Sequence, residues 1–296
     1  MIVVKLMGGL GNQMFQYALG RSLAERHGTE LKMDLSFLLD RTVRPNFTCR
    51  NYELGVFQVK ESFASAEDLQ SFPPSPQRSR LARLFKLLGG GSPGRISERH
   101  FHFDAAVLDS PVPCYLEGYW QSEKYFAEIA PLLRADFALR QEPQGLNREV
   151  ASAITGCEAV SVHIRRGDYV ADAKVAAKYA ACGGRYFTRA AELMLARVAR
   201  PHFFVFSDDP DWVRQHFSIP HATTLVQHNG PDQAQEDLRL MSLCRHHIIA
   251  NSTFSWWGAW LDPRPDKIVV APQSWFNDPA IDTGDLMPAS WLRLPV

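Results

Sequence analysis

The amino-acid sequence predicts an α/β protein of two domains, each built on a parallel, doubly wound sheet with helices on its faces. Its 296 residues fit two domains on a prior of ~150 residues each. In both halves, short apolar runs of strand length alternate with stretches of helical periodicity. Residues 137–150, which include Glu142-Pro143-Gln144-Gly145, are expected to be a linker. We therefore expect domains at residues 1–145 and 146–296.

Composition and charge exclude several classes of protein. The 32 basic and 32 acidic residues cancel, which argues against a general nucleic-acid binder. The five cysteines are scattered without a C-x-x-C pair, which argues against a zinc site or a disulfide framework and fits a reducing compartment. The apolar N-terminus is only one strand long, and no apolar run reaches the ~18 residues of a membrane span. We expect a soluble, cytoplasmic protein.

The first domain opens with a strand at Ile2–Leu6, a glycine loop at residues 8–13, a helix from about Met14 to Arg26 and a strand at residues 30–33. Gly9 and Gly11, with Asp34 further on, resemble a dinucleotide-binding fingerprint whose third glycine is missing. The alternative is a simple tight turn. In either case, backbone amides at a helix N-terminus, beside Asn12, suit an anion or a sugar hydroxyl.

The middle of the first domain is less regular. Ser71 to Pro76 is a break, and Arg78–Leu88 is a basic amphipathic stretch followed by a glycine-rich segment. This stretch either contacts an anionic membrane surface or, as we favour, is a solvated helix face. After a strand near Leu116, Tyr119 and Trp120 either stack on a sugar ring or belong to the core, and a helix is expected from about Glu123.

The second domain continues the alternation of strands and helices. Asp209 and Pro210 have the residue types that favour an N-cap and the first position of a helix. The expected strands are residues 159–164, 202–207, 224–227, 247–250 and 267–271, and the expected helices are residues 186–198, 232–245 and a segment that begins near residue 251.

The first strand of the second domain ends in a polar cluster. Val160, Val162 and Ile164 alternate with polar residues, so His163 and Arg165 fall on one face of the strand. Arg165 and Arg166 are adjacent, and guanidinium groups bind dianions through several fixed donors. The alternative is a pair of surface arginines paired with Asp168.

Three expected strands of the second domain end in polar clusters, at residues 163–168, 207–209 and 251–253. Ligands of open parallel sheets bind beyond the carboxyl ends of the strands, so the sequence predicts a nucleotide-diphosphate site. The arginines would pair with phosphates, and Asp208 would accept hydrogen bonds from a guanine edge or a ribose. Asn251, Ser252 and Thr253 would hold a phosphate at a helix start, cap that helix, or do both.

Asp209-Pro210-Asp211 has the letters of a D-x-D metal motif. Acidic residues are also favoured in the first turn of a helix, and we prefer this explanation. We therefore expect no obligatory metal, and the arginines would neutralise the departing diphosphate.

Four motifs, in this order, resemble the α-1,2-fucosyltransferases, and the bacterial non-membrane members most closely. They are G-G-L-G-N-Q-M-F-Q-Y at residues 8–17, H-I-R-R-G-D-Y at 163–169, F-S-D-D at 206–209 and A-N-S-T-F-S-W-W-G-A-W at 250–260. The resemblance implies a GT-B fold of two Rossmann-like domains facing across a cleft. It also implies GDP-fucose as donor, a terminal β-galactoside as acceptor, and metal-independent transfer with inversion that forms an α-1,2 linkage.

The resemblance also implies roles for individual residues. His163 and Arg165 would contact the phosphates or the fucose of the donor, with Arg166 beside them. Asp208 would face the guanine, and Ser252 and Thr253 would approach the diphosphate. Gly9, Gly11 and Asn12 belong to the loop that would reach the donor from the first domain.

The general base of such a reaction is not identified by the sequence. Asp168, Asp34 and Glu117 are the candidates, in that order, and Asp168 has the alternative role of orienting the arginines. A nicotinamide-dependent oxidoreductase and a non-catalytic nucleotide-sugar or glycan-binding protein are the rival functions. Weak peripheral membrane contact and a role in lipopolysaccharide or O-antigen synthesis are further expectations.

Overall fold

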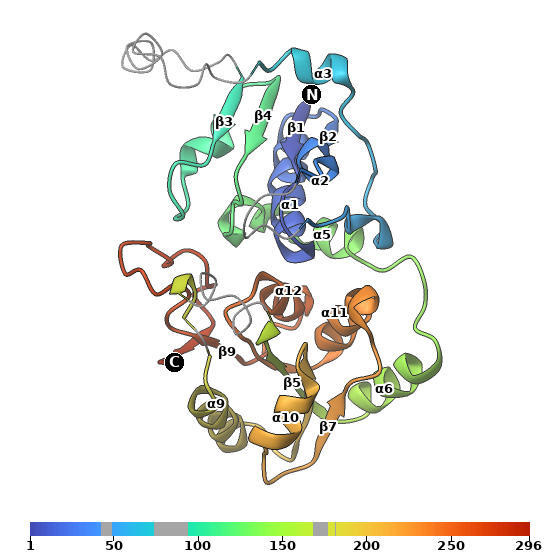
Figure 1. The fold of residues 1–296 in the computed structure, drawn as a ribbon, viewed down its shortest axis with the longest axis vertical. Coiled ribbons are helices and arrows are strands. Elements are labelled where there is room, and N and C mark those ends of the chain that lie inside the picture. Colours follow the sequence, from blue (N-terminus) through green and yellow to red (C-terminus); the bar gives the residue numbers. More distant parts are fainter. Residues whose placement is uncertain (43–48, 74–93, 168–176, 181) are drawn as a thin grey trace. The chain divides into compact units, whose positions relative to one another are not determined.

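The computed structural model describes residues 1–42, 49–73, 94–167, 177–180 and 182–296. The chain forms two compact units (Figure 1). Unit 1 comprises Met1–Ala138 with Gly284–Leu286, and unit 2 comprises Leu139–Thr283 with Met287–Val296. Each unit contains one parallel sheet, as the sequence predicts. The basic stretch at residues 78–88 lies outside the described residues.

The sheet of unit 1 has four strands in the order β2-β1-β4-β3, all parallel. Its strands are β1 (Ile2–Lys5), β2 (Leu31–Asp34), β3 (Arg95–Ser97) and β4 (Cys114–Glu117). The two expected N-terminal strands are therefore present, and β3 is an addition. Because the strand order reverses between β1 and β4, a crevice for ligands is expected at the carboxyl ends of these two strands.

The long helix of unit 1 begins earlier than predicted. α1 spans Leu10–Arg26, so the glycine loop that we expected at residues 8–13 is limited to Gly8 and Gly9. Gly28, just past the helix, has φ +56°, as expected for a C-terminal glycine. Two 3-10 turns precede α5 where a helix from Glu123 was expected. The remaining helices are α2 (Ser36–Leu39), η1 (Leu54–Val56), α3 (Ala66–Gln70), η2 (Ala105–Asp109), η3 (Glu123–Tyr125), η4 (Ala127–Ile129) and α5 (Ala130–Asp136).

The sheet of unit 2 has six parallel strands in the order β10-β9-β8-β5-β6-β7. Counted along the chain from β5, this is the 3-2-1-4-5-6 order of a Rossmann fold, and it reverses between β5 and β8. Its strands are β5 (Glu158–Ile164), β6 (Pro201–Ser207), β7 (Thr223–Val226), β8 (His246–Ile248), β9 (Val269–Pro272) and β10 (Leu292–Leu294).

The helices of unit 2 confirm most of the predicted elements. α10 begins at Pro210, and the Asp209 carboxylate accepts a hydrogen bond from the Trp212 amide at 3.1 Å, so Asp209 is its N-cap. The linker prediction was wrong for residues 145–150, which form the first turns of α6. The helices are α6 (Gly145–Thr155), α9 (Gly184–Arg197), α10 (Pro210–His216), η5 (Pro231–Gln233), α11 (Ala234–Leu243) and α12 (Thr253–Leu261). No described helix is long and apolar enough to cross a membrane.

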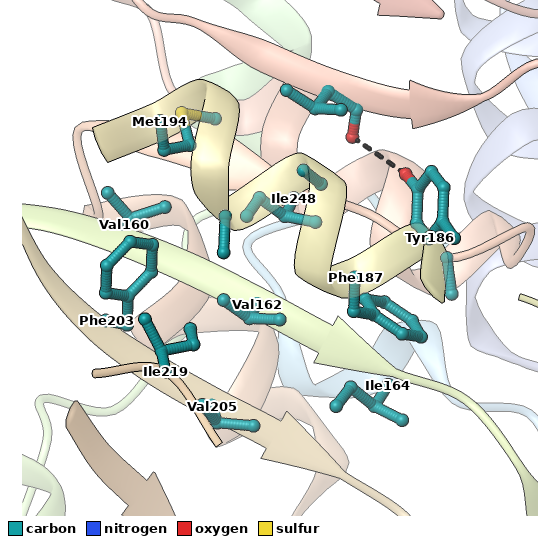
Figure 2. Packing of buried hydrophobic residues seen from close by; sticks show 14 of the residues in the cluster. Val160, Val162, Ile164, Tyr186, Phe187, Met194, Phe203, Val205, Ile219 and Ile248 are labelled. Atoms are coloured by element: carbon teal, nitrogen blue, oxygen red, sulfur yellow. Dashed lines mark hydrogen bonds between the residues drawn. The ribbon is translucent and has the colours of Figure 1, made fainter. Parts of the chain in front are cut away.

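Strand β5 is buried on both faces. Val160, Val162 and Ile164 project toward α9 and belong to one buried cluster with Tyr186, Phe187 and Met194 of that helix (Figure 2). Burying an aliphatic side chain of this size stabilises the folded state by about 1.5–3 kcal/mol. The predicted alternation is therefore confirmed, and it leaves the polar side chains of β5 on the opposite face.

Candidate functional site

The polar ends of β5, β6 and β8 meet in two groups within unit 2. The loop after β5 binds Asp208 and Asp209 at the end of β6. His163, near the end of β5, contacts Ser255 in the first turn of α12, which follows β8. Because the sheet order reverses between β5 and β8, this edge is where a Rossmann sheet binds its ligand.

Asp208 holds the loop that carries the arginines. Its carboxylate accepts hydrogen bonds from the amides of Arg166, at 2.8 Å, and Gly167, at 3.0 Å. The Arg165 guanidinium forms an ion pair with it at 2.8 Å. A side chain at Gly167 would place its Cβ 2.5 Å from the Asp208 carboxylate, so any larger residue would force the loop or Asp208 to shift. Asp208 thus organises the loop formed by Arg165, Arg166 and Gly167, which we call the arginine loop. Contact between Asp208 and a guanine stays a prediction.

Both arginines face carboxylates at the end of β6. Arg166 pairs with Asp209 at 3.3 Å, and its guanidinium lies 3.9 Å from the ring centroid of Trp212, a cation–π contact. Asp168, which we considered as the partner of the arginines and as a catalytic base, lies outside the described residues. The partners that the structure shows are distant in sequence and adjacent in the sheet.

His163 is a buried, neutral imidazole. Burial, with a smaller contribution from the positive charge of Arg165, lowers its pKa to about 4 against the opposing effect of Asp208. Its Nδ1 is hydrogen-bonded to the Ser255 hydroxyl, which fixes the orientation of the ring. At neutral pH His163 therefore offers hydrogen bonding rather than positive charge to this edge of the sheet.

The three polar residues that lead into α12 have different roles. Asn251 is buried, and its side-chain amide donates to the carbonyls of Ala180, at 2.6 Å, and Trp275, at 3.2 Å. Ser252 has the extended backbone of an N-cap, but its hydroxyl makes no capping hydrogen bond, so that part of the expected capping role was wrong. Thr253 is the first residue of the helix. The helix start remains suited to an anion, and all three phosphate contacts stay predictions.

A carboxylate of the chain itself, that of Glu53, occupies the start of α1 beside the glycine loop of unit 1. Gly9 is the N-cap of α1, and the amide of the next residue, Leu10, donates to the Glu53 carboxylate at 3.0 Å. Gly11 is buried within α1, and Asn12 accepts a hydrogen bond from Gln121 at 2.9 Å. Donor contacts by Gly9, Gly11 and Asn12 stay predictions.

Two carboxylates that we considered as bases are committed to partners inside unit 1. Asp34 is buried and accepts hydrogen bonds from the Tyr115 hydroxyl at 2.6 Å and from Ser36. Glu117 pairs with Lys5 at 2.7 Å and Arg95 at 2.9 Å. Burial raises the pKa of Glu117, but hydrogen bonds from Lys5 and Arg95 outweigh it, and the pKa falls below its usual value. The cationic partners of Glu117 make it a poor proton acceptor, and the Asp34 carboxylate is already engaged by its hydrogen-bond donors.

The D-x-D letters mark a helix start. Asp209 caps α10 and pairs with Arg166, and Asp211 pairs with Arg214 in the first turns of the helix. Among the described residues, no three His, Cys, Asp or Glu side chains form a group that could hold a metal ion. Independence from metal stays a prediction.

The Tyr119-Trp120 pair separates into one exposed and one buried residue. Trp120 is buried with φ +56°, a strained conformation for a large side chain, so the core interpretation holds for it. Glu98 accepts hydrogen bonds from the amides of Tyr119, at 2.8 Å, and Trp120, at 2.9 Å, and so supports this turn. Tyr119 is 39% exposed.

Sequence reasoning missed a chain of buried polar residues beneath the site. The Ser161 hydroxyl lies 2.9 Å from His247 Nδ1, and His247 Nε2 lies 3.2 Å from the Asp262 carboxylate. The series serine, histidine, aspartate resembles a hydrolytic triad, but all three side chains are buried, so no substrate reaches the serine. The chain links β5, β8 and the end of α12. The only signal in the sequence was Ser161 on the polar face of β5.

Comparisons with known proteins agree with this architecture. The sequence model of Glycosyl transferase family 11 matches residues 97–294. An alpha-1,2-colitosyltransferase of Escherichia coli is 33% identical, over 99% of this chain and 98% of the relative. The O-antigen biosynthesis glycosyltransferase WbnK of Escherichia coli is 30% identical, over 98% and 99%. The mouse galactoside 2-alpha-L-fucosyltransferase Sec1 is 26% identical, over 71% of this chain and 61% of the relative.

Two solved structures share the fold of this chain. The NodZ alpha-1,6-fucosyltransferase, from a crystal soaked with GDP-fucose, aligns with a TM-score of 0.50 and 16% identity, over 91% of this chain and 94% of that chain. The apo form of POFUT1 aligns with a TM-score of 0.50 and 13% identity, over 91% and 97%. At this identity the alignments establish the GT-B fold alone. The matched family model and the two full-length bacterial relatives show that the chain belongs to glycosyl transferase family 11.

Proposed function

We propose that this chain is a galactoside α-1,2-fucosyltransferase. It transfers L-fucose from GDP-fucose to O2 of a terminal β-galactoside, such as lactose, N-acetyllactosamine or a related polysaccharide unit, with inversion and without a metal. The observation that carries the proposal is the arginine loop of unit 2. Asp208 and Asp209 hold Arg165 and Arg166 at the carboxyl edge of the sheet, close to the point between β5 and β8 where the strand order reverses. Neutral His163 and the start of α12 lie at the same edge.

The arginine loop suits a leaving diphosphate. Negative charge grows on the leaving oxygen as the bond to the sugar breaks, and donors that are already in place stabilise that charge most. Arg165 exchanges part of its contact with Asp208 for a phosphate oxygen, and Arg166 remains supported by Trp212. Guanidinium groups bind phosphate through two parallel hydrogen bonds, so one arginine both orients the leaving group and neutralises it.

His163 supplies a hydrogen bond without adding charge. With Nδ1 engaged by Ser255, the ring is oriented for its Nε2 to meet a polar group of the donor. A neutral imidazole here does not compete with the arginines for the diphosphate. It favours a sugar hydroxyl or a single phosphate oxygen as the partner.

The names of the relatives support a fucose-like sugar as the transferred group, and they suggest a second candidate donor. Mouse Sec1 is named a galactoside fucosyltransferase, whereas the bacterial relative with 33% identity is named a colitosyltransferase. Colitose is L-fucose without its hydroxyl at C3, so one hydroxyl separates the two donors. WbnK is named for O-antigen biosynthesis, which supports a role on lipopolysaccharide glycans. A cytoplasmic location, with weak peripheral membrane contact, belongs to the same proposal.

The test is incubation of the purified chain with lactose and a panel of GDP-sugars that includes GDP-fucose and GDP-colitose. We expect a fucosylated product with an α-1,2 linkage to galactose. Absence of transfer from GDP-fucose overturns the proposal, and transfer from GDP-colitose alone establishes the second candidate. Glycan binding without any product would instead support the non-catalytic alternative.

A further inference from the structure

The guanidinium of Arg166 is held by the start of α10. Its Nε lies 3.3 Å from the Asp209 carboxylate, and its central carbon lies 3.9 Å from the ring centroid of Trp212. The carboxylate thus engages the Nε side of the guanidinium, and the indole lies against it. Within the described parts of the chain, neither Nη atom of Arg166 makes a hydrogen bond.

The two arginines of the arginine loop therefore differ in what they can offer a ligand. Nη1 of Arg165 already pairs with the Asp208 carboxylate at 2.8 Å, whereas Arg166 is held through Nε and its ring contact. A phosphate accepts two parallel N–H donors from one guanidinium, and the two Nη atoms of Arg166 form such a pair. Arg166 can offer this pair without giving up a partner.

Trp212 is itself fixed in place. Its backbone amide donates to Oδ1 of Asp209 at 3.1 Å, while Oδ2 of the same carboxylate faces Arg166. Its indole is half-buried against the core cluster of unit 2 and stacks on the His216 ring at a centroid distance of 5.0 Å. The surface against which the guanidinium lies is therefore anchored from several sides.

We propose that Trp212 is a positioning residue for the nucleoside diphosphate of the donor, an inference that rests on the proposed function. The indole holds the Arg166 guanidinium in the orientation that leaves both Nη atoms to the diphosphate. Without the indole, Arg166 keeps only its contact with Asp209 and can adopt several rotamers. Binding must then order the side chain, which lowers the affinity for the ligand.

Two other roles for Trp212 make different demands. Packing at the rim of the core needs apolar surface, which a leucine also supplies, whereas attraction to a guanidinium needs an aromatic face. Direct stacking on the base of the nucleotide also needs the aromatic ring, but it would not depend on Arg166. Substitutions at both positions therefore separate the three roles.

The experiment is calorimetric titration of the purified full chain with GDP alone. We expect Trp212→Leu to raise the Kd for GDP by about 2–30-fold, and Trp212→Phe, which keeps an aromatic face, to restore most of the affinity. The matched control is Phe217→Leu, because Phe217 follows α10 and packs against the same core cluster, with its ring 5.9 Å from that of Phe187. This control should lower Tm and leave the Kd unchanged.

A double-mutant cycle tests whether Trp212 acts through Arg166. In an Arg166→Ala background, Trp212→Leu should change the Kd for GDP by less than about twofold. An equal effect in both backgrounds overturns the inference in favour of direct stacking, and a Trp212→Leu variant with wild-type Kd overturns it in favour of packing.

The proposed function is tested separately, because GDP binding requires neither fucose nor an acceptor. A wild type that binds GDP but transfers no fucose refutes the proposed function, and the cycle still decides the role of Trp212. A wild type that does not bind GDP overturns both.

Discussion

Replacing Arg165 by alanine removes a guanidinium that lies 2.8 Å from the Asp208 carboxylate. The two side chains are 29% and 23% exposed, so solvent screens their attraction. Partly exposed ion pairs of this kind contribute about 0.2–1 kcal/mol to stability. Asp208 also keeps its two hydrogen bonds from the backbone amides of Arg166 and Gly167. The fold, and the loop itself, should therefore survive the substitution with a small change in Tm.

The effect of Arg165→Ala on catalysis should be much larger. Loss of one donor aimed at developing negative charge typically lowers kcat by about 10²–10³-fold, or about 2.7–4 kcal/mol. Product formation from GDP-fucose and lactose, measured beside thermal unfolding, separates the two effects. Arg245→Ala is the control, because Arg245 also pairs with a carboxylate, Asp266 at 3.1 Å, but at the start of β8. A kcat for Arg165→Ala within about threefold of wild type would refute the leaving-group role.

Three further predictions test the site and its support. Gly167→Ala should displace the arginine loop, because its Cβ would lie 2.5 Å from the Asp208 carboxylate, and KM for GDP-fucose should rise. The pKa values of buried His163 and His247 are lowered to about 4, so unfolded chains bind more protons than folded ones below about pH 6.5. Stability to urea should thus be full above pH 6.5 and fall toward pH 4, by up to about 1.4 kcal/mol per pH unit for each histidine, whereas a flat profile would contradict their neutral burial. Activity should persist in excess EDTA, and loss that manganese restores would revive a metal role for Asp209 and Asp211.

Features that depend on local sequence could be predicted. Alternation along β5 identified the faces of Val162 and His163, and the Asp209-Pro210 pair marked the start of α10 because capping involves only neighbouring residues. The three polar strand ends could be assigned to one sheet edge because parallel strands share their direction. The three-residue strands β3 and β10 were missed, since a run that short carries no measurable period.

Features that depend on distant partners could not be predicted. The sequence suggested Asp168 as a partner of the arginines because they are close in the chain, and that pairing stays a prediction. Nothing in the sequence indicated that Asp208, a residue of the neighbouring strand end, would pair with Arg165, as it does in the structure. Gln13 looks like a polar residue of a loop, yet it is fully buried because Asn51 and Glu53 satisfy its amide. A sequence pattern cannot show that a buried amide has hydrogen-bond partners when these partners come from a distant segment of the chain.

The buried chain of Ser161, His247 and Asp262 has a consequence for strand alignment. A slip of β8 by one residue along β5 would turn His247 to the other face and leave the Ser161 hydroxyl and the Asp262 carboxylate buried without it. Arg264 would still pair with one oxygen of Asp262, but the other oxygen and the Ser161 hydroxyl would lose their buried hydrogen-bond partner, which costs about 1–3 kcal/mol for each group, so misaligned pairings are disfavoured. Ser161 lies two positions before His163 on the same face of β5. The strand alignment that these hydrogen bonds enforce therefore also determines the positions of His163 and the arginines at the edge of the sheet.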